Sequence, residues 1–174
     1  MKRPDRPARF DAIFLPHLDA AHNLARWIIG NPQDAEDAVQ DSFVRALTYF
    51  ESFRGEDGRA WLLAIVRHTC FERLRKNKQH VEMPVEDLDL ARDSGPSPET
   101  LQLQSADRAE VQRGLEALPP EFREVLVLRE MEGLSYKQIA RVADVPIGTV
   151  MSRLARARQR LAEALTSATR KETA

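Results

Sequence analysis

Residues 84–107 form a segment that differs from the sequence on either side. It carries six acidic side chains and one basic one, a net charge of −5, whereas residues 1–83 carry +1 and residues 108–174 carry +3. The segment also contains Pro84, Gly95, Pro96 and Pro98, and its apolar residues show little sustained periodicity. This composition is typical of a linker. We therefore expect two folded parts of about 80 and 70 residues, each only marginally stable alone.

Apolar residues on both sides of this segment recur at helical spacing. Asn31 followed by Pro32 is typical of a helix start, because asparagine caps the first turn and proline tolerates the first helical position. From there Val39, Phe43 and Leu47 recur every four residues on one apolar stripe, and a second helix is expected over residues 59–78. No alternating strand pattern occurs. We predict an all-α fold of two small helical domains joined by an acidic flexible linker.

Residues 135–165 carry the pattern of a helix-turn-helix motif. Ser135 and Gln138 form a capping box for a short helix, and a turn through Pro146 precedes a longer helix. The core-facing stripe of that helix comprises Ile147, Val150, Leu154, Ala157 and Leu161, and its opposite face comprises Thr149, Ser152, Arg153, Arg156, Gln159 and Arg160. Arginine and hydroxyl side chains on a free helix face suit the major groove of DNA. A solvated basic face is the alternative, but the capped preceding helix and the short turn favour DNA.

A second basic patch ends the N-terminal part. Its cations are Arg67, Arg73, Arg75, Lys76 and Lys78, opposed only by Glu72, and the aromatic residues Phe53, Trp61 and Phe71 flank it. Single-stranded bases stack on aromatic rings beside cations. Two other readings stay open: cations near a helix C-terminus favour the helix dipole, and each aromatic residue could belong to the core.

The helix that begins after Asn31 also has an acidic face. Asp34, Asp37, Asp41, Val44 and Thr48 project opposite its apolar stripe. An acidic solvent face explains the carboxylates, whereas an exposed valine among them indicates a docking face for a basic partner helix.

The sequence argues against several other classes of protein. A single cysteine, Cys70, excludes an internal disulfide and a cysteine-cluster metal site, and we expect it to pack as a small apolar side chain. The four histidines form no metal-binding motif and no glycine-rich phosphate loop occurs, so we expect no enzyme, metal or cofactor. The longest apolar run, 61–66, falls short of the roughly 20 residues of a membrane span. Residues 1–15 lack the apolar stretch of a secretory signal, so we expect a cytoplasmic protein.

Two stretches of the chain resemble one known family. Residues 34–47, Phe53-Arg-Gly and residues 59–75 are similar to region 2 of the extracytoplasmic-function (ECF) sigma factors of bacterial RNA polymerase. Residues 118–129, 133–140 and 145–158 are similar to region 4 of the same family. Both matches occur in the family's order and at its separation, and with the linker they cover nearly the whole chain.

The resemblance implies a promoter-specificity subunit that has no active site of its own. Region 2 would occupy residues 1–83, the acidic linker and the start of the C-terminal domain residues 84–107, and region 4 residues 108–174. The residues implied to dock on the β′ clamp helices of the core polymerase are Asp34, Asp37, Gln40, Asp41 and Val44. Those implied to melt and hold the −10 element are Phe53, Arg54, Trp61, Arg67, His68, Arg73, Arg75 and Lys76. Region 4 would bind the β flap and contact the −35 element through Thr149, Ser152, Arg153, Arg156 and Arg160. The resemblance also implies an anti-sigma factor that covers both DNA-binding surfaces.

Two residues depart from the family pattern. His68 stands where many relatives have asparagine, and Met151 stands where many have lysine or arginine.

Two other classes of function compete with this one. A helix-turn-helix regulator that acts without polymerase would explain the C-terminal part and would be expected to dimerise on a palindrome. A pure interaction module would have two solvated basic faces and no salt-dependent affinity for DNA.

Overall fold

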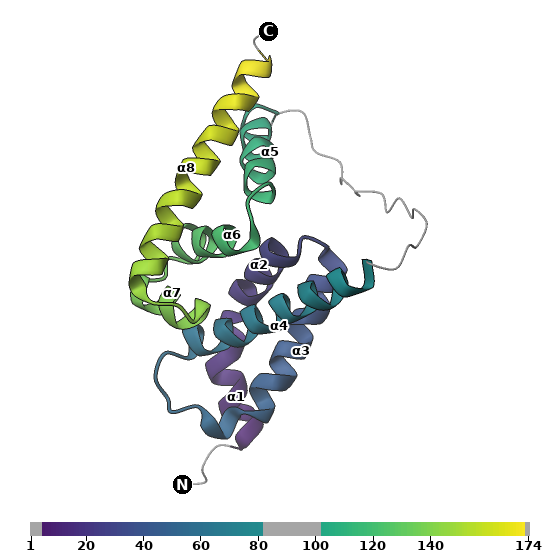
Figure 1. The fold of residues 1–174 in the computed structure, drawn as a ribbon. Helices are drawn as coiled ribbons and strands as arrows, with labels where there is room; N and C mark the ends of the chain where they lie inside the picture. The colour runs from purple at the N-terminus through teal and green to yellow at the C-terminus, as the bar shows by residue number, and fades with distance from the viewer. Residues whose placement is uncertain (1–4, 82–101, 173–174) are drawn as a thin grey trace.

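The fold was analysed in a computed structural model, which describes residues 5–81 and 102–172. All regular structure in these ranges is helical, and the helices form two groups, one from each side of the linker (Figure 1). The first group comprises α1 (Arg6–Phe14), η1 (Leu15–His17), α2 (Leu18–Ile29), α3 (Pro32–Thr48), η2 (Phe50–Ser52) and α4 (Gly58–Val81). The second comprises α5 (Gln102–Glu116), α6 (Pro120–Leu126), the π-helical turn η4 (Val127–Met131), α7 (Tyr136–Ala143) and α8 (Ile147–Glu172). The predicted all-α fold of two helical domains is confirmed, while residues 84–101 of the predicted linker lie outside the described residues.

In the N-terminal group, α2, α3 and α4 pack against one another around an apolar core. Leu24 and Ile28 of α2, four residues apart, are fully buried, as are Leu62 and Val66 of α4. Gly30 ends α2 at a φ of 84°, a backbone conformation that side chains with a Cβ rarely adopt. The chain then turns directly into α3.

The N-terminal end of this group is rich in aromatic contacts. Phe14 of α1 lies fully buried and stacks on Trp61 of α4, with ring centroids 5.1 Å apart. Phe10, Phe50 and Phe53 complete the cluster around it. These contacts hold the loop between η2 and α4 against the helices.

In the C-terminal group, α8 packs against α5, α6 and α7. Gly114 allows the close approach of α5, because a Cβ at this position would lie 2.8 Å from Leu161 Cδ1. Val150, Leu154 and Ala157 of α8 are buried as expected. Figure 1 shows α8 along the outer edge of the molecule, with α7 between it and the N-terminal group.

The helix starts predicted from sequence are confirmed in their hydrogen bonds. Asn31 Oδ1 accepts from the Asp34 amide at 3.0 Å. Ser135 Oγ accepts from the Gln138 amide at 3.2 Å, while Gln138 Oε1 accepts from the Ser135 amide at 2.8 Å. Each of these caps satisfies backbone N–H groups that have no partner within the helix.

Two residues assigned to apolar stripes are not in the core. Ile147 is 45% exposed and Leu47 is 42% exposed. Ile147 belongs to the first turn of α8, where neighbouring helices cover only one side, and Leu47 belongs to the last turn of α3. The stripe prediction is therefore wrong at both helix ends, where packing partners run out.

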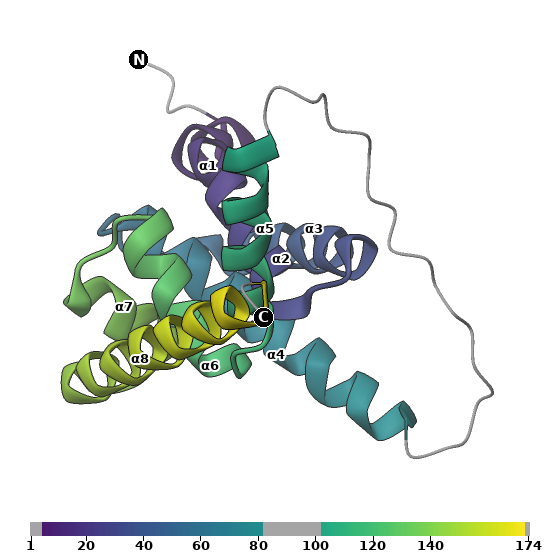
Figure 2. The same cartoon turned by 90° about the horizontal axis from the view of Figure 1, so that it is seen from above.

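The two groups contact each other, and we call this packing the closed arrangement. Helix α4 packs against α7, and α2 packs against α6 and η4, across the domain interface. Figure 2 shows the C-terminal end of α4 projecting beyond both groups.

Candidate nucleic-acid interface

An aromatic pocket lies where the loop 53–57 enters α4. Phe53 and Trp61 are half-buried, with ring centroids 5.2 Å apart, and they line a cavity of about 350 Å3 together with Ser52, Arg54 and Asp57. The structure thus brings together three of the predicted −10 residues, Phe53, Arg54 and Trp61. A flat aromatic surface beside an exposed guanidinium is suited to a stacked base.

Asp57 fixes the geometry of this pocket. Its Oδ1 accepts from the Ala60 amide at 3.0 Å and so caps α4. Burial by itself would raise the pKa of Asp57, but the hydrogen bonds from Ala60 and Gln138 and the nearby guanidinium groups of Arg141 and Arg59 outweigh it and hold this pKa below its ordinary value. The carboxylate therefore stays charged and ordered at the pocket's edge.

The far side of the pocket comes from the other domain. Gln138 Nε2 of α7 donates to Asp57 Oδ2 at 2.6 Å, while its Oε1 completes the capping box of α7. Arg141 of α7 also lines the pocket, and its Nη2 lies 3.8 Å from Glu56 Oε2. The first helix of the helix-turn-helix motif thus partly closes the aromatic pocket.

Arg67 reaches across the domain interface to a buried carboxylate. Its Nε lies 2.8 Å from Glu124 Oε2 and its Nη2 lies 3.1 Å from Glu124 Oε1, a bidentate pair. Glu124 is fully buried, and its burial raises its pKa even though the hydrogen bonds and charge of Arg67, together with Arg153, act in the opposite direction. Arg67 also covers the ring of Phe71 at 4.5 Å from the centroid.

The other predicted −10 cations follow α4 away from the pocket. His68, Arg75 and Lys76 are exposed. Arg73 Nη2 instead lies 2.6 Å from Asp41 Oδ2, so a predicted −10 residue pairs with a predicted polymerase-binding residue.

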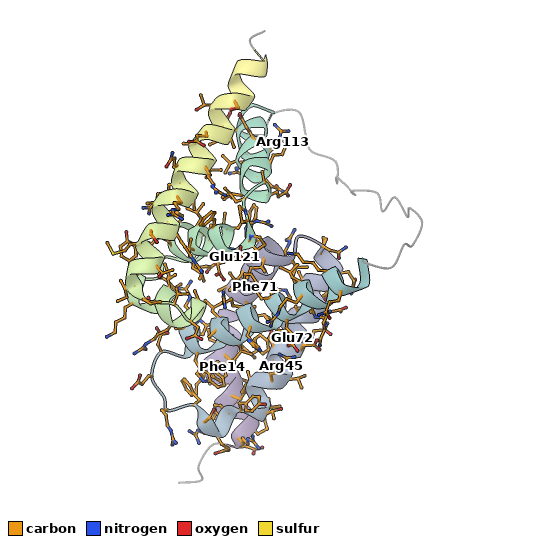
Figure 3. The ribbon with its side chains drawn as sticks, in the orientation of Figure 1. Phe14, Arg45, Phe71, Glu72, Arg113 and Glu121 are labelled. Atoms are coloured by element: carbon orange, nitrogen blue, oxygen red, sulfur yellow. The ribbon has the colours of Figure 1, made fainter. Side chains whose placement is uncertain are left out.

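A second ionic contact, besides that of Arg73 with Asp41, joins helices α3 and α4. Figure 3 labels Arg45 and Glu72, whose Nη1 and Oε2 atoms are 2.7 Å apart. Lys76 Nζ also lies 3.3 Å from Glu72 Oε1. Carboxylates therefore pair with two of the cations of the basic patch, Arg73 and Lys76.

The acidic face of α3 lies outside the core. Val44 is 66% exposed, Gln40 and Asp41 are exposed, and Asp34 and Asp37 are half-exposed. No other part of the described chain buries the side chain of Val44. Its role in docking remains a prediction.

The outer face of α8 differs from the predicted one at a single arginine. Ser152 and Arg156 are exposed, Thr149 is half-buried, and Arg160 is exposed with its guanidinium 4.8 Å from the centroid of Phe122. The side chain of Arg153 is only 24% exposed, and its Nη1 lies 3.7 Å from Glu124 Oε1. Arg153 therefore faces inward in this structure.

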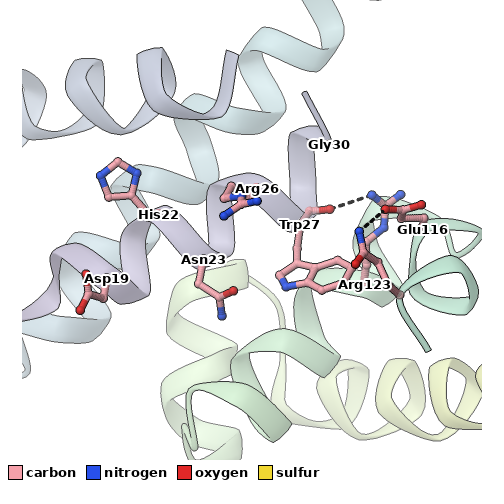
Figure 4. Close-up of a pocket in the computed structure, with 9 residues that line it drawn as sticks. Asp19, His22, Asn23, Arg26, Trp27, Gly30, Glu116 and Arg123 are labelled. Carbon is pink, nitrogen blue, oxygen red and sulfur yellow. Dashed lines mark hydrogen bonds between the residues drawn. The ribbon is translucent and has the colours of Figure 1, made fainter. Parts of the chain in front are cut away.

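Further polar contacts close the domain interface near η4. Glu132 accepts from Asn23 Nδ2 and from Arg59 Nη2, each at 2.7 Å, and its side chain is 12% exposed. Arg123 Nη1 donates to the Trp27 carbonyl at 2.7 Å, as Figure 4 shows. A cavity of about 450 Å3 opens beside this bond, between α2 and the helices α5 and α6.

The residues that the sequence analysis did not single out for the site are those that cross the interface. Glu124, Glu132, Gln138 and Arg141 all contact residues of the N-terminal group. Only Gln138 carried a local signal, its place in the capping box. The other contacts join residues too far apart in the chain for a local pattern to reveal them.

The described residues lack two features of other classes of protein. No three histidine, cysteine, aspartate or glutamate side chains in the described part gather in a way that could hold a metal ion. Among the helices of that part, none has the length and apolar character needed to span a bilayer. Cys70 is buried, as expected, and its burial raises its pKa to about 12.

Comparison with known proteins identifies both groups of helices. Residues 13–80 match the model of Sigma-70 region 2, and residues 108–161 match that of Sigma-70, region 4. The chain is 40% identical to the ECF RNA polymerase sigma factor SigM of Mycobacterium tuberculosis, over 90% of this chain and 76% of that protein. It is 34% identical to the ECF RNA polymerase sigma factor SigE of Mycolicibacterium smegmatis, over 90% of this chain but only 61% of that protein.

Two solved structures resemble the whole described fold. The sigma factor RpoE of Bartonella quintana, in complex with the anti-sigma factor NepR, matches with a TM-score of 0.71 and 29% identity, covering 91% of this chain and 97% of that one. CnrH, in complex with the cytosolic domain of CnrY, matches with a TM-score of 0.65 and 26% identity, covering 94% of this chain and 91% of that one. The two regions, their order and these relatives show that the chain belongs to the ECF family of RNA polymerase sigma factors.

Proposed function

We propose that this protein is a promoter-specificity subunit of bacterial RNA polymerase, which directs promoter recognition, promoter melting and transcription initiation. The observation that carries the proposal is the combination, in one chain, of an aromatic pocket on α4 and a helix-turn-helix with exposed Ser152 and Arg156. The pocket suits an unstacked base, and the outer face of α8 suits duplex DNA. A regulator that reads only duplex DNA has no use for the pocket.

The proposal divides the chain into three parts. Residues 1–83 bind the core polymerase and the −10 element, residues 84–107 link the domains and begin the second, and residues 108–174 bind the −35 element. The −10 contacts proposed at the pocket are Phe53, Arg54 and Trp61, with Arg67, His68, Arg73, Arg75 and Lys76 following the strand along α4. The −35 contacts proposed on α8 are Thr149, Ser152, Arg153, Arg156 and Arg160.

The acidic face of α3 is the proposed docking surface for core polymerase. Asp34, Asp37, Gln40 and Asp41 surround the exposed Val44, and basic residues of a partner helix complement such a face. The partners proposed are the β′ clamp helices for this face and the β flap for region 4. We propose that the protein carries no active site of its own and acts in the cytoplasm, where its polymerase is.

An anti-sigma factor is the proposed inhibitor. The solved relative from Bartonella quintana is bound to one, and the present chain adopts a similar overall fold. Such a partner would act by keeping the −10 and −35 surfaces from DNA.

Transcription by purified components tests the proposal. The chain is mixed with core polymerase and a promoter library, and the start sites that depend on the chain are mapped. Specific starts that share two upstream elements support the sigma function. If no complex and no transcript form, while the chain alone binds duplex DNA as a dimer, the protein is instead an operator-binding regulator.

A further inference from the structure

The first turns of α8 carry an exposed apolar edge. Ile147 is 45% exposed and Met151 is 54% exposed, and one helical turn separates them, so they lie side by side on one face. Ala155, one turn further, is exposed as well. Val150, Leu154 and Ala157, on the adjoining side of α8 where α5, α6 and α7 pack, are buried. The edge therefore faces outward.

This edge lies next to the polar residues of the same helix face. Ser152 and Arg156 are exposed and again one turn apart. Arg153 is held inward by Glu124, with its Nη1 buried and without a hydrogen-bond partner. The exposed residues at the start of α8 thus include the guanidinium of Arg156, the hydroxyl of Ser152 and the two large apolar side chains.

DNA presents a matching apolar group at one kind of base. In the major groove, the four base pairs differ in their donors and acceptors, and thymine alone adds a methyl group at C5. Methionine is unbranched and polarisable, so its thioether adapts to a small apolar partner. The exposed cation Arg156, five residues further along α8, complements the phosphate charge of the same duplex.

We propose that Met151, supported by Ile147, reads the methyl group of a thymine in the −35 element and so determines specificity at that position. This inference rests on the proposed function, because it assigns one base contact within the promoter that region 4 binds.

The test removes one methyl group from the DNA. Each thymine in the −35 element of a promoter recovered from the library is replaced in turn by deoxyuridine, which lacks only the C5 methyl. Binding of the holoenzyme, made from core polymerase and the full chain, is then measured for every fragment. At one position the loss should weaken binding about fourfold, the equivalent of one methyl group removed from water.

The variant Met151→Gln identifies the side chain responsible. Glutamine is close to methionine in length and is a good helix former, so an exposed substitution leaves α8 folded. The variant should bind the thymine and deoxyuridine fragments equally, and selection from a random library should lose thymine at that position. Equal sensitivity in wild type and Met151→Gln, or no sensitive thymine at all, would overturn the inference.

The control Arg156→Ala separates this inference from the function on which it rests. If Arg156→Ala lowers −35 discrimination while Met151→Gln changes nothing, the sigma function stands and the thymine contact is refuted. If no −35 element emerges and neither variant matters, the proposed function fails as well. Loss of core polymerase binding in Met151→Gln, with DNA selectivity unchanged, would assign the apolar edge to a protein partner and overturn the inference.

Discussion

The substitution Glu132→Gln should open the closed arrangement without touching a proposed DNA contact. Glu132 belongs to the C-terminal domain, yet it accepts hydrogen bonds from Asn23 and Arg59 of the N-terminal domain, each at 2.7 Å. The substitution keeps the size of the side chain and one acceptor oxygen but removes the charge. It therefore weakens two contacts that exist only while the domains are closed.

The size of the effect follows from the exposure of the partners. A hydrogen bond to a charged group contributes about 1.5–3 kcal/mol when it is buried. The side chain of Glu132 is 12% exposed, but that of Arg59 is 32% exposed. Solvent screening therefore reduces the contribution of the Arg59 hydrogen bond to the free energy of closure. We expect a loss of roughly 1–2 kcal/mol in the free energy of closure. At about 1.4 kcal/mol per tenfold change, the ratio of closed to open molecules falls roughly 5- to 30-fold.

A matched control lies two residues away. Glu130 pairs with Arg158 at 2.6 Å, but this pair lies within the C-terminal domain and its side chains are 55% and 49% exposed. Glu130→Gln removes the same charge from the same segment and leaves the domain interface intact. It should change closure by less than about 0.5 kcal/mol, as expected for an exposed pair outside the interface.

Single-molecule energy transfer measures closure directly. Dyes are attached to Glu36→Cys on α3 and Ala162→Cys on α8, both exposed positions in different domains. The native Cys70 does not interfere, because it is buried and its pKa is about 12. Glu132→Gln should shift molecules toward low transfer. The difference from the native chain should shrink as salt rises, because salt screens the Arg59–Glu132 ion pair that only the native chain retains. Identical distributions for the two glutamine variants, with both proteins folded, would refute the role of Glu132 in closure.

Three further outcomes are expected. Asp37→Arg combined with Asp41→Arg should abolish co-purification with core polymerase while circular dichroism stays unchanged, and undiminished co-purification would remove the α3 face from the model. The folded-state pKa of Asp57 lies below its ordinary value of 3.8, so its contribution to stability is present above pH 3.8 and is lost as the pH falls through the folded-state pKa. Urea unfolding should accordingly lose more free energy between pH 5 and pH 3 in the native chain than in Asp57→Asn. Cys70 should react with a thiol reagent at pH 8 more than about 100-fold faster in concentrated urea than in the folded protein, because burial protects it and disfavours its thiolate.

The sequence predicts those features of the fold that depend on neighbouring residues. The Asn31 cap joins groups three residues apart, as does the Ser135 capping box, and both form as expected. Helical spacing also identifies the buried side of α8 at Val150 and Leu154. It fails at Ile147, because periodicity gives the direction of a side chain but not how far along the helix the neighbouring helices extend.

The site is less predictable because several of its contacts cross between domains. Arg67 and Glu124 are 57 residues apart, and Gln138 and Asp57 are 81 apart. From sequence alone, an arginine on a basic helix is predicted to have no ion-pair partner. Arg67 is instead satisfied by a fully buried carboxylate from the other domain.

If Arg67 contacts DNA as proposed, its pairing with Glu124 links DNA binding to closure. In the closed arrangement Glu124 of the C-terminal domain pairs with Arg67. The pair of Asp41 and Arg73 lies within the N-terminal domain, and Arg75 is exposed on the same helix. Affinity for a nucleic-acid backbone grows with the number of cations free to displace counterions. A strand that binds α4 therefore competes with Glu124 for Arg67, and it binds the open form more tightly than the closed one. The two equilibria are coupled, and the coupling is reciprocal. Opening of the domain interface raises the affinity for the strand, and binding of the strand favours opening by the same factor.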